Sequence, residues 1–264
     1  MLELSHLCKT FNKGTINEKP ALRDLNLHLA PGDFVTVIGG NGAGKSTMLN
    51  AVAGVWPVDS GSITIDGVDV TAMPEYKRAQ FIGRVFQDPM MGTAPDMQIE
   101  ENMALALRRG QKRTFRWQIT RQERALFQEK LKLLGLGLED RMTSKVGLLS
   151  GGQRQALTLL MASLQQPKLL LLDEHTAALD PATAAKVLEL SDRIVAENRL
   201  TAMMITHNMT DAIRHGNRLI MMNNGQIVLD ISGAEKQKLT KAELLERFAV
   251  STGVQEETDS LILS

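Results

Sequence analysis

The chain has a single cysteine and no excess of charge of either sign. Cys8 alone cannot form a disulfide within the chain or build a thiolate metal site, so we interpret it as a small apolar residue suited to a reducing compartment. Thirty Lys and Arg residues balance thirty Asp and Glu residues, which leaves no net positive field to hold nucleic acid. These absences argue against a disulfide scaffold and predict no nucleic-acid partner.

Long hydrophobic runs, a secretion signal and internal repeats are missing as well. The most apolar stretches, 156–164 and 169–172, are far shorter than the roughly 18 to 20 residues that a helix needs to cross a bilayer. The first ten residues carry glutamate and histidine where a signal peptide has basic residues followed by an apolar run. We therefore expect a chain that stays in the cytosol and does not span a membrane.

What remains is the composition of a folded globular protein. Hydrophobic residues make up 43% and charged residues 23% of the 264 residues, close to globular averages. Strand-like and helix-like segments alternate, as expected of a largely parallel sheet with helices on its faces. A short β-rich run at 34–38 predicts a strand, and continuous apolar runs at 169–172 and 202–205 suit strands that are buried on both faces. The sequence therefore predicts an α/β fold.

Three other patterns predict how this fold is organised. The turns Asp66-Gly67 and Asn223-Asn224-Gly225 lie between β-like runs and indicate antiparallel hairpins. Helix-forming composition replaces β runs between about 91 and 163, with helical spacing at 100–107 and 121–134. Thr240 and Glu243 look like a capping box that opens a short helix through Phe248, before a frayed tail. We expect one domain over 1–250, with an α/β core and antiparallel part at 1–90 and 164–232, a helical subdomain at 91–163, and a C-terminal helix and tail at 233–264.

The strongest chemical signal is a glycine-rich loop between the predicted strand 34–38 and a helical pattern. It matches G-x-x-x-x-G-K-[ST] and reads Gly39, Gly40, Asn41, Gly42, Ala43, Gly44, Lys45 and Ser46, followed by Thr47. The glycines let backbone N–H groups converge on phosphate oxygens, and the helix N-terminus adds a favourable potential. In this pattern Lys45 reaches the β- and γ-phosphates and the Ser46 hydroxyl ligates Mg²⁺. The loop predicts binding of a nucleoside triphosphate with magnesium.

Two acids follow the apolar run at 169–172, at the edge where open α/β sheets bind ligands. Asp173 can hold Mg²⁺ directly or through water. Glu174 is then placed to orient and deprotonate a water for in-line attack on the γ-phosphate. The sequence therefore predicts hydrolysis as well as binding.

A third segment distinguishes among phosphate-loop families. Leu149 is followed by Ser150, Gly151, Gly152 and Gln153, where Ser150 could cap a helix whose N-terminus faces an anion. With the glycine loop, Gln87, the two acids, Asp180 and His207 in the same order, the segment resembles the nucleotide-binding subunit of ATP-binding cassette (ABC) transporters over about residues 1–230. The resemblance implies a phosphate-loop (RecA-like) core with an antiparallel β subdomain and an inserted helical subdomain.

The resemblance also implies a role for each of these residues. Ser150, Gly151, Gly152 and Gln153 would contact the nucleotide on a second copy of the chain, so that two ATP molecules are enclosed in a head-to-tail homodimer. Gln87 would sense Mg²⁺ and the attacking water, His207 would contact the γ-phosphate and align Glu174, and Asp180 would act across the dimer. Asp180 followed by proline also reads as a helix N-cap. The catalytic set is then Glu174, His207, Gln87 and Lys45, and the metal set is Ser46, Gln87 and Asp173.

Some positions keep two interpretations or depart from the family pattern. Phe11 either stacks on adenine or is a core phenylalanine. Gly40 stands where the family commonly has proline or serine. His175 stands where it has proline, and Ala177 where it has serine. None of the three changes removes a phosphate, metal or base group. We interpret His175 as a surface residue, although it could shift the geometry of its loop or titrate near neutrality.

The sequence says less about cargo, because in this architecture cargo touches other subunits. The amino-acid sequence of residues 39–42, 86–93 and 173–178 resembles that of a bacterial importer subgroup linked to tryptophan or tyrosine uptake. That resemblance implies two transmembrane permease subunits, an extracytoplasmic substrate-binding protein, and a peripheral place on the cytoplasmic face of the cell membrane. An exporter of lipid or lipoprotein, uptake of another solute, and a soluble ABC ATPase acting on nucleic acid or ribosomes are the alternatives.

A basic segment in the helical subdomain has no family role. Its cations are interleaved with Phe115 and Trp117 and are Arg108, Arg109, Lys112, Arg113 and Arg116. One hypothesis is contact with anionic lipid head groups or the permease, because each basic residue at an anionic surface contributes on the order of 1 kcal/mol. The alternative is a solvated basic face.

Overall fold

The computed structural model describes residues 1–111 and 119–252, so most of the basic segment, from Lys112 to Trp117, and the end of the tail lie outside the described residues. The strands are β1 (Leu2–Phe11), β2 (Lys19–Leu29), β3 (Phe34–Ile38), β4 (Ser60–Ile65), β5 (Val68–Asp69), β6 (Ile82–Val85), β7 (Leu169–Asp173), β8 (Thr201–Ile205), β9 (Arg218–Asn223) and β10 (Gln226–Ser232). The helices are α1 (Lys45–Ala53), α2 (Glu75–Arg78), α3 (Ile99–Leu107), α4 (Arg121–Lys132), α5 (Gly151–Ser163), α6 (Pro181–Asn198), α7 (Met209–Arg214), α8 (Gly233–Lys238) and α9 (Lys241–Thr252). Two short 3₁₀ turns, Leu138–Asp140 and Val146–Leu148, lie between α4 and α5. No helix within these two described ranges is long and apolar enough to cross a membrane.

A six-stranded sheet forms the centre of the fold, with the strand order β10-β9-β3-β8-β7-β6. Strands β9, β3, β8, β7 and β6 pair in parallel, and β10 pairs antiparallel with β9. Side chains alternate along β7: Leu169 and Leu171 join one hydrophobic cluster, and Leu170 and Leu172 join another. Because both faces are covered, the strand is apolar from Leu169 to Leu172. The predicted α/β fold is confirmed.

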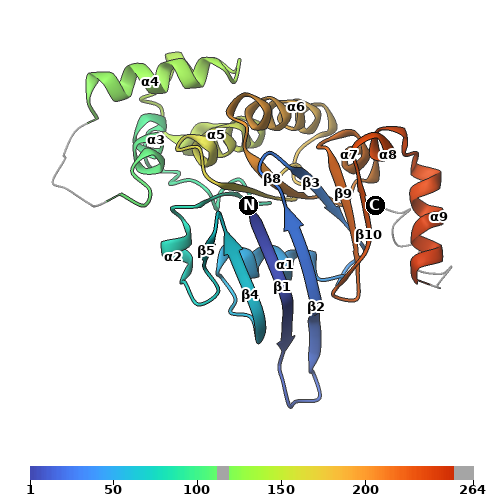
Figure 1. Ribbon diagram of the computed structural model, residues 1–264. Coiled ribbons are helices and arrows are strands. Elements are labelled where there is room, and N and C mark those ends of the chain that lie inside the picture. The colour runs from blue at the N-terminus through green and yellow to red at the C-terminus, as the bar shows by residue number, and fades with distance from the viewer. Residues whose placement is uncertain (112–118, 253–264) are drawn as a thin grey trace.

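The second sheet is antiparallel, with the order β2-β1-β4-β5. It packs with α1 against one face of the large sheet, while α5 and α6 cover the other face (Figure 1). The hairpin at Asp66-Gly67 was expected, but β1 and β2 gave no clear strand signal. Register shifts interrupt their pairing between Leu4 and Leu7 and again beyond Leu7, which breaks the alternation that identifies a half-buried strand. Cys8 lies half-buried on β1 with its Sγ 3.4 Å from the Asp24 backbone nitrogen.

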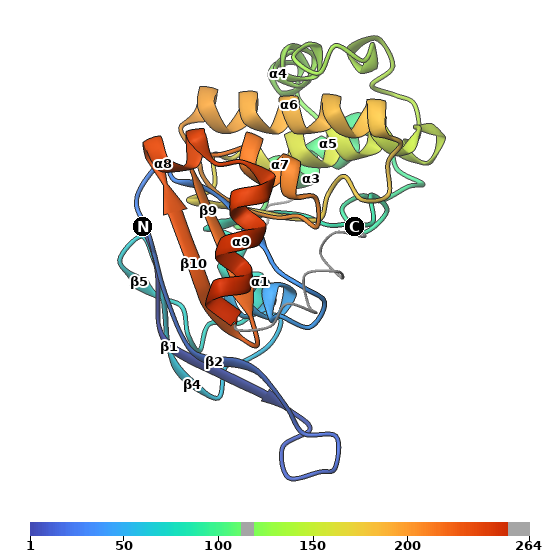
Figure 2. The same cartoon turned by 90° about the vertical axis from the view of Figure 1, so that its right-hand side faces the viewer.

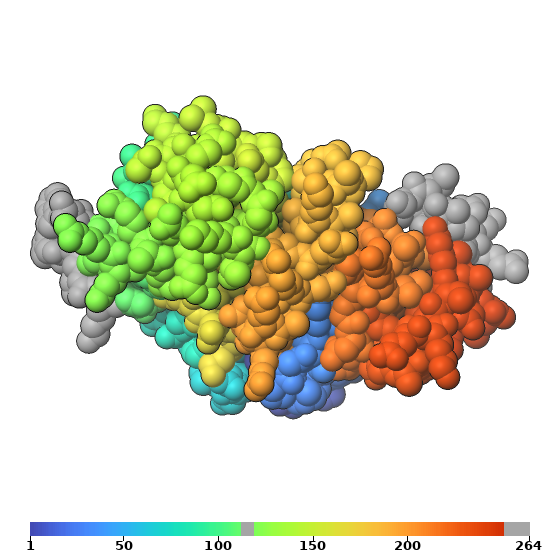
Figure 3. All heavy atoms as spheres, turned by 90° about the horizontal axis from the view of Figure 1, so that it is seen from above, coloured from blue at the N-terminus to red at the C-terminus, as the bar shows by residue number. Residues whose placement is uncertain are grey.

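Helices α3, α4 and α5 form a lobe with a hydrophobic cluster of its own, centred on side chains such as Met103, Phe127 and Leu157. Seen from above, this lobe stands at one end of the molecule, α6 runs beside it, and α7 to α9 lie towards the other end (Figure 3). The helices expected at 100–107 and 121–134 are confirmed, with α4 ending at Lys132.

The chain after β10 packs two helices against the edge of the large sheet (Figure 2). Thr240 and Glu243 form the expected capping box: the Thr240 N–H donates to the Glu243 carboxylate at 2.8 Å, and the Glu243 N–H donates to Thr240 Oγ1 at 3.2 Å. Helix α9 continues to Thr252, four residues beyond the expected end at Phe248. Leu244 and Phe248 are fully buried in the cluster with β9 and β10.

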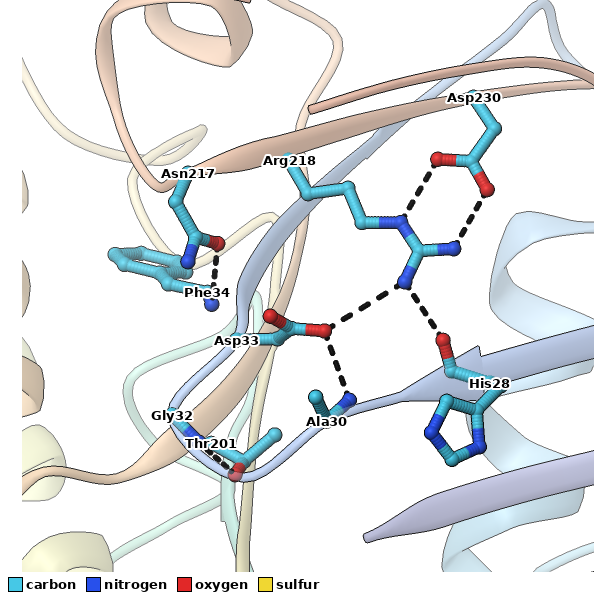
Figure 4. Close-up of polar contacts among 9 residues, drawn as sticks. All are labelled: His28, Ala30, Gly32, Asp33, Phe34, Thr201, Asn217, Arg218 and Asp230. Atoms are coloured by element: carbon cyan, nitrogen blue, oxygen red, sulfur yellow. Dashed lines mark hydrogen bonds and ion pairs between the residues drawn. The ribbon is translucent and has the colours of Figure 1, made fainter. Parts of the chain in front are cut away.

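An ionic network joins the two sheets at the amino ends of the parallel strands (Figure 4). Arg218, at the start of β9, donates to both carboxylate oxygens of Asp230 at 2.8 and 2.6 Å and to the His28 carbonyl at 2.6 Å. Asp33 lies 3.6 Å from the same guanidinium and accepts the Ala30 N–H. The hydrogen bonds with Asp230, with a smaller contribution from Asp33, raise the pKa of Arg218 above its usual value against the effect of burial. They fix the edge of the sheet that lies opposite the functional site.

Candidate functional site

The glycine loop connects β3 to α1, as predicted. Two of its glycines are required by the backbone. Gly44 has φ +102°, and a Cβ there would lie 2.5 Å from the Ala21 carbonyl oxygen. Gly39 has φ +149°, and a Cβ there would overlap the Met222 carbonyl. A further bond, from the Gly225 N–H to the Ala43 carbonyl at 3.0 Å, ties the loop to the β9–β10 turn. The loop conformation is therefore set by neighbouring backbone on two sides.

Helix α1 begins with free backbone donors. Its N-cap is Gly44, which has no side chain to accept a bond from the first-turn N–H groups. These groups have no partner within a helix and carry partial positive charge. Ser46 is exposed in this first turn. The start of α1 is thus suited to a phosphate group.

Lys45 is 5% exposed, and its ammonium group lies within the loop. Its Nζ donates to the carbonyl oxygens of Gly39 at 2.6 Å and Gly40 at 3.1 Å. Burial lowers the pKa of Lys45, and the attraction of Glu174 opposes that shift. A phosphate in the loop would give this buried cation a charged partner in place of neutral carbonyls.

The two acids lie at the carboxyl end of β7, as predicted, and have different partners. Arg84 on β6 donates to Asp173 Oδ2 at 3.1 Å and to Asn50 Oδ1 at 2.8 Å. Its guanidinium also lies 4.6 Å from the centre of the Phe86 ring. Sequence reasoning did not identify Arg84, because an arginine inside a strand carries no signal until the sheet places β6 beside β7.

Glu174 and His207 are in direct contact, with 2.5 Å between Oε1 and Nε2. They come from neighbouring strands, since His207 follows β8 and the Glu174 N–H donates to the Ile205 carbonyl at 3.1 Å. Glu174 has φ +45°, a left-handed conformation that non-glycine residues avoid. Its side chain is only 12% exposed. The backbone therefore directs this carboxylate toward His207 and the glycine loop.

These groups surround one cavity of about 260 Å³. Its lining contains Phe11, the loop and first helical turn from Asn41 to Thr47, Glu174 and His207. It also contains Lys19 and Ala21 from β2, which sequence reasoning did not identify. The Phe11 ring packs edge-on against Trp56 with centroids 4.9 Å apart. Phe11 thus has a packing partner and still borders the cavity.

Gly39 and Gly40, before the lining part of the loop, and Asp173, at the end of β7, do not line this cavity. The remaining predicted residues lie at helix starts or in an exposed turn outside it. Ser150 caps α5: its Oγ accepts from the Gln153 N–H at 3.3 Å, and Gln153 Oε1 accepts from the Ser150 N–H at 3.2 Å. Asp180 caps α6 by accepting from the Thr183 N–H at 3.1 Å, and the hydrogen bonds with Thr183 lower its pKa.

The starts of α5 and α6 lie close together. A Cβ on Gly152 would overlap the Cγ2 of Thr183, and one on Gly151 would lie 3.6 Å from Leu179. Gln87 is exposed just beyond β6. The residue before it is held by the buried Gln155, whose Nε2 donates to the Phe86 carbonyl at 3.0 Å. One chain therefore brings the loop, Glu174 and His207 together, and leaves Gln87, the α5 start and Asp180 outside their cavity.

The expectation for His175 is wrong. It is 2% exposed, not a surface residue, and its Nε2 lies 2.9 Å from Ser191 Oγ on α6. Burial, followed by the nearby His215, lowers its pKa to about 4, so it is neutral near pH 7. Sequence alone gave no sign of this, because the partner lies on a helix whose packing is set by the whole sheet.

Comparisons with known proteins agree with this geometry. A family profile described as ABC transporter matches residues 22–177. The chain belongs to the ATP-binding subunits of the ABC transporter family and is an ATPase.

Individual relatives and solved structures extend the match over nearly the whole chain. A tyrosine transport ATP-binding protein of Clostridioides difficile is 44% identical over 94% of this chain and 98% of its own length. A methionine import ATP-binding protein of Vibrio vulnificus is 35% identical over 96% of this chain and 71% of its own length. A dimeric ATP-binding cassette bound to ADP and phosphate in a post-hydrolysis state superposes with a TM-score of 0.75 at 29% identity, covering 88% of this chain and 98% of the other.

Proposed function

We propose that the chain hydrolyses ATP to drive import of an aromatic amino acid through separate membrane subunits. The observation that carries the hydrolytic part is the single cavity bordered by the glycine loop, Lys45, Glu174 and His207. The observation that supports the cargo is the 44% identity, over nearly the full length of both chains, to a protein named for tyrosine transport.

ATP binding follows from the loop. Backbone N–H groups of the loop and of the first turn of α1 bind the phosphates, and Lys45 moves its ammonium from the Gly39 and Gly40 carbonyls to the β- and γ-phosphates. Phe11 offers a ring face to adenine at the same cavity. The other residues that bind the nucleotide held by the same chain are those of the predicted loop, Gly39 to Thr47.

Magnesium fits the donors that the site offers. The described residues contain no group of three or more His, Cys, Asp or Glu side chains that would form a complete protein cage. Ser46, Asp173 and Gln87 supply hard oxygen donors, and Mg²⁺ usually takes few protein ligands and completes its shell with water and phosphate oxygens. Arg84 engages Oδ2 of Asp173. When bound, the ion neutralises charge on the phosphates.

Glu174 and His207 carry the hydrolytic step. The Glu174 carboxylate accepts the proton of the attacking water, and His207 holds that carboxylate through its Nε2 while it contacts the γ-phosphate. Gln87 orients the water from the exposed turn after β6. Lys45 stabilises the charge that gathers on the phosphate oxygens.

A second copy of the chain completes the site. The exposed α5 start, with Ser150, Gly151 and Gly152, does not border the cavity of its own chain, and neither does Asp180. A head-to-tail homodimer places these donors on the partner's ATP. The dimeric cassette to which this chain is similar supports that arrangement.

The organisation of the transporter follows from the family. Two permease subunits dock on a pair of these chains at the cytoplasmic face of the membrane, and an extracytoplasmic binding protein delivers the cargo. The helical subdomain at 91–163 and the core at 1–90 and 164–232 remain our division of the chain, with 233–264 as a C-terminal extension.

The test is purification of the complex from its native membrane, followed by ATPase assay with single amino acids. Tyrosine and tryptophan are expected to stimulate turnover with a permease and a binding protein present, and methionine serves as the comparison because a relative is named for it. Stimulation by methionine alone would overturn the aromatic cargo. Recovery with only soluble partners or nucleic acid would overturn the transporter assignment.

A further inference from the structure

The backbone at Glu174 needs support from outside its own strand. Glu174 has φ +45°, and such a conformation persists in a non-glycine residue only where the surroundings hold it. On the β7 side, Asp173 pairs with Ile205 and the Glu174 N–H donates to the Ile205 carbonyl at 3.1 Å. On the other side, the chain leaves the sheet toward α6, where sheet hydrogen bonds no longer fix it.

On that side a turn bond from the Ala177 N–H to the Glu174 carbonyl at 2.9 Å holds the backbone, and His175 adds a side-chain link to α6. It is 2% exposed and lies 2.9 Å from Ser191 Oγ, and Ser191 is itself 1% exposed. The Ser191 hydroxyl donates its only proton to the Val187 carbonyl at 2.9 Å, as serines in helices often do. Its oxygen is then left to accept, so the His175 Nε2–H is the donor. A direct hydrogen bond thus joins the residue after Glu174 to the middle of α6.

Asp192, which follows Ser191 on α6, anchors the segment that carries His207, the partner of Glu174. Asp192 Oδ2 lies 2.6 Å from His215 Nδ1. His215 terminates α7, and α7 starts directly after His207, with Asn208 as its N-cap. The buried Lys236 on α8 donates to the carbonyl oxygens of His215 and, at 2.9 Å, of Gly216. Two adjacent residues of one helix therefore hold the segments that carry Glu174 and His207.

We propose that His175 and Ser191 are positioning residues for ATP hydrolysis, which tie the Glu174 backbone to α6 and so keep its carboxylate against His207. The proposal rests on the role of Glu174 given under the proposed function. Neither residue touches the cavity, so both act through Glu174. A small displacement of a catalytic group slows chemistry strongly, whereas the phosphate loop is held by other contacts.

The test compares His175→Leu, Ser191→Ala and His175→Gln in the full chain. Leucine fills a similar volume without a donor, alanine removes the acceptor, and glutamine keeps an amide N–H near the place of Nε2. We expect kcat to fall about tenfold or more in the first two, with ATP Kd and KM within about twofold of wild type, and glutamine to restore most of the rate. The double variant His175→Leu with Ser191→Ala should be no slower than the slower single one, because both remove the same bond.

Ser163→Ala is the matched control. Ser163 is a buried serine on α5 whose hydroxyl also donates to a carbonyl of its own helix, Leu160 at 2.9 Å, and it lies away from Glu174. It should keep kcat even if Tm falls as in Ser191→Ala. Should His175→Leu fail to fold, the smaller change Ser191→Ala decides.

Three results would overturn the proposal: an unchanged kcat in a folded Ser191→Ala or His175→Leu, a His175→Gln variant as slow as His175→Leu, or a loss of kcat that tracks Tm in Ser163→Ala as well. A failure of the proposed function looks different. In that case wild type does not hydrolyse ATP, or Glu174→Gln turns over at the wild-type rate.

Discussion

Lys45 is a buried ammonium whose partners, in the chain alone, are the neutral carbonyls of Gly39 and Gly40. Replacing them with phosphate oxygens gives charge-assisted bonds, which are roughly twice as strong as neutral ones. Lys45→Ala should therefore raise the Kd for ATP by about 10- to 100-fold, from a loss of about 1.5 to 3 kcal/mol. Isothermal titration calorimetry measures this, with the exposed Lys238→Ala as control. Equal affinity in the two variants would contradict the phosphate-clamp role.

Lys236 is 2% exposed, and burial lowers its pKa to about 8, against the opposing attraction of Asp192. Between pH 8 and the ordinary pKa of lysine, the unfolded chain holds a proton that the folded chain has released. The free energy of unfolding should therefore rise with pH in that window, by at most about 1.4 kcal/mol per pH unit from this group. Below pH 8 both states hold the proton, and the contribution of Lys236 stays constant.

Urea unfolding at pH 7.5, 8.5 and 9.5 tests this linkage. Lys236→Met should lose the rise that wild type shows above pH 8, whereas Lys238→Met, an exposed lysine on the same helix, should keep it. An identical slope in wild type and Lys236→Met would mean that Lys236 does not titrate in this range.

For single residues, the sequence predicts those whose role depends on their neighbours along the chain. The glycine loop, Asp173 and Glu174 are identifiable because each lies at a fixed offset from a strand in the chain itself. Three residues were missed because their partners are distant in sequence: Arg84 contacts β7, Gln155 contacts the turn after β6, and Lys19 borders the glycine loop. His175 was misplaced because its partner lies on α6. No pattern within a short segment reports such a contact.

At the scale of elements, the start of α5 packs tightly on the start of α6. A Cβ on Gly152 would overlap the stiff side chain of Thr183, whereas Gly151 has room at 3.6 Å from Leu179. Gly152→Ala should therefore lower the free energy of unfolding by about 1 to 3 kcal/mol, and Gly151→Ala should stay within about 0.5 kcal/mol of wild type. Chemical denaturation measures both.

Thr183→Ala provides the rescue for this pair. The Thr183 Cβ lies 3.6 Å from the added Cβ, an ordinary contact, so removing Cγ2 should restore most of the stability lost in Gly152→Ala. A double variant as unstable as Gly152→Ala would show that another contact restricts this position.

Elements buried on two faces were the easiest to predict. β7 and β8 contain the unbroken apolar runs 169–172 and 202–205, β3 is a short β-rich run, and the hairpin turns follow from Asp66-Gly67 and Asn224-Gly225. β1 and β2 were not found, because register shifts and the left-handed residues His6 and Asp24 break their alternation. α9 packs on the β9–β10 cluster through Leu244 and Phe248 and runs four residues past its expected end, which that contact does not explain.

At the scale of the whole molecule, the exposed starts of α5 and α6 predict ATP-dependent dimerisation. Glu174→Gln keeps the phosphate contacts and slows their loss, so it should form a dimer with ATP and remain a monomer with ADP. Light scattering after size exclusion measures the mass. Adding Ser150→Arg should prevent the dimer while ATP still binds, because the bulky side chain blocks the partner's nucleotide. A dimer of the double variant would contradict the head-to-tail interface.

In the proposed function, one cavity couples the glycine loop to Glu174 and His207 for hydrolysis. The most direct measurement is phosphate release from ATP with magnesium by wild type and Glu174→Gln, with ATP affinity measured on both. We expect Glu174→Gln to bind ATP as wild type does and to release phosphate about 100-fold or more slowly, the range for loss of a general base. Release within a few-fold of the wild-type rate would show that Glu174 is not the general base.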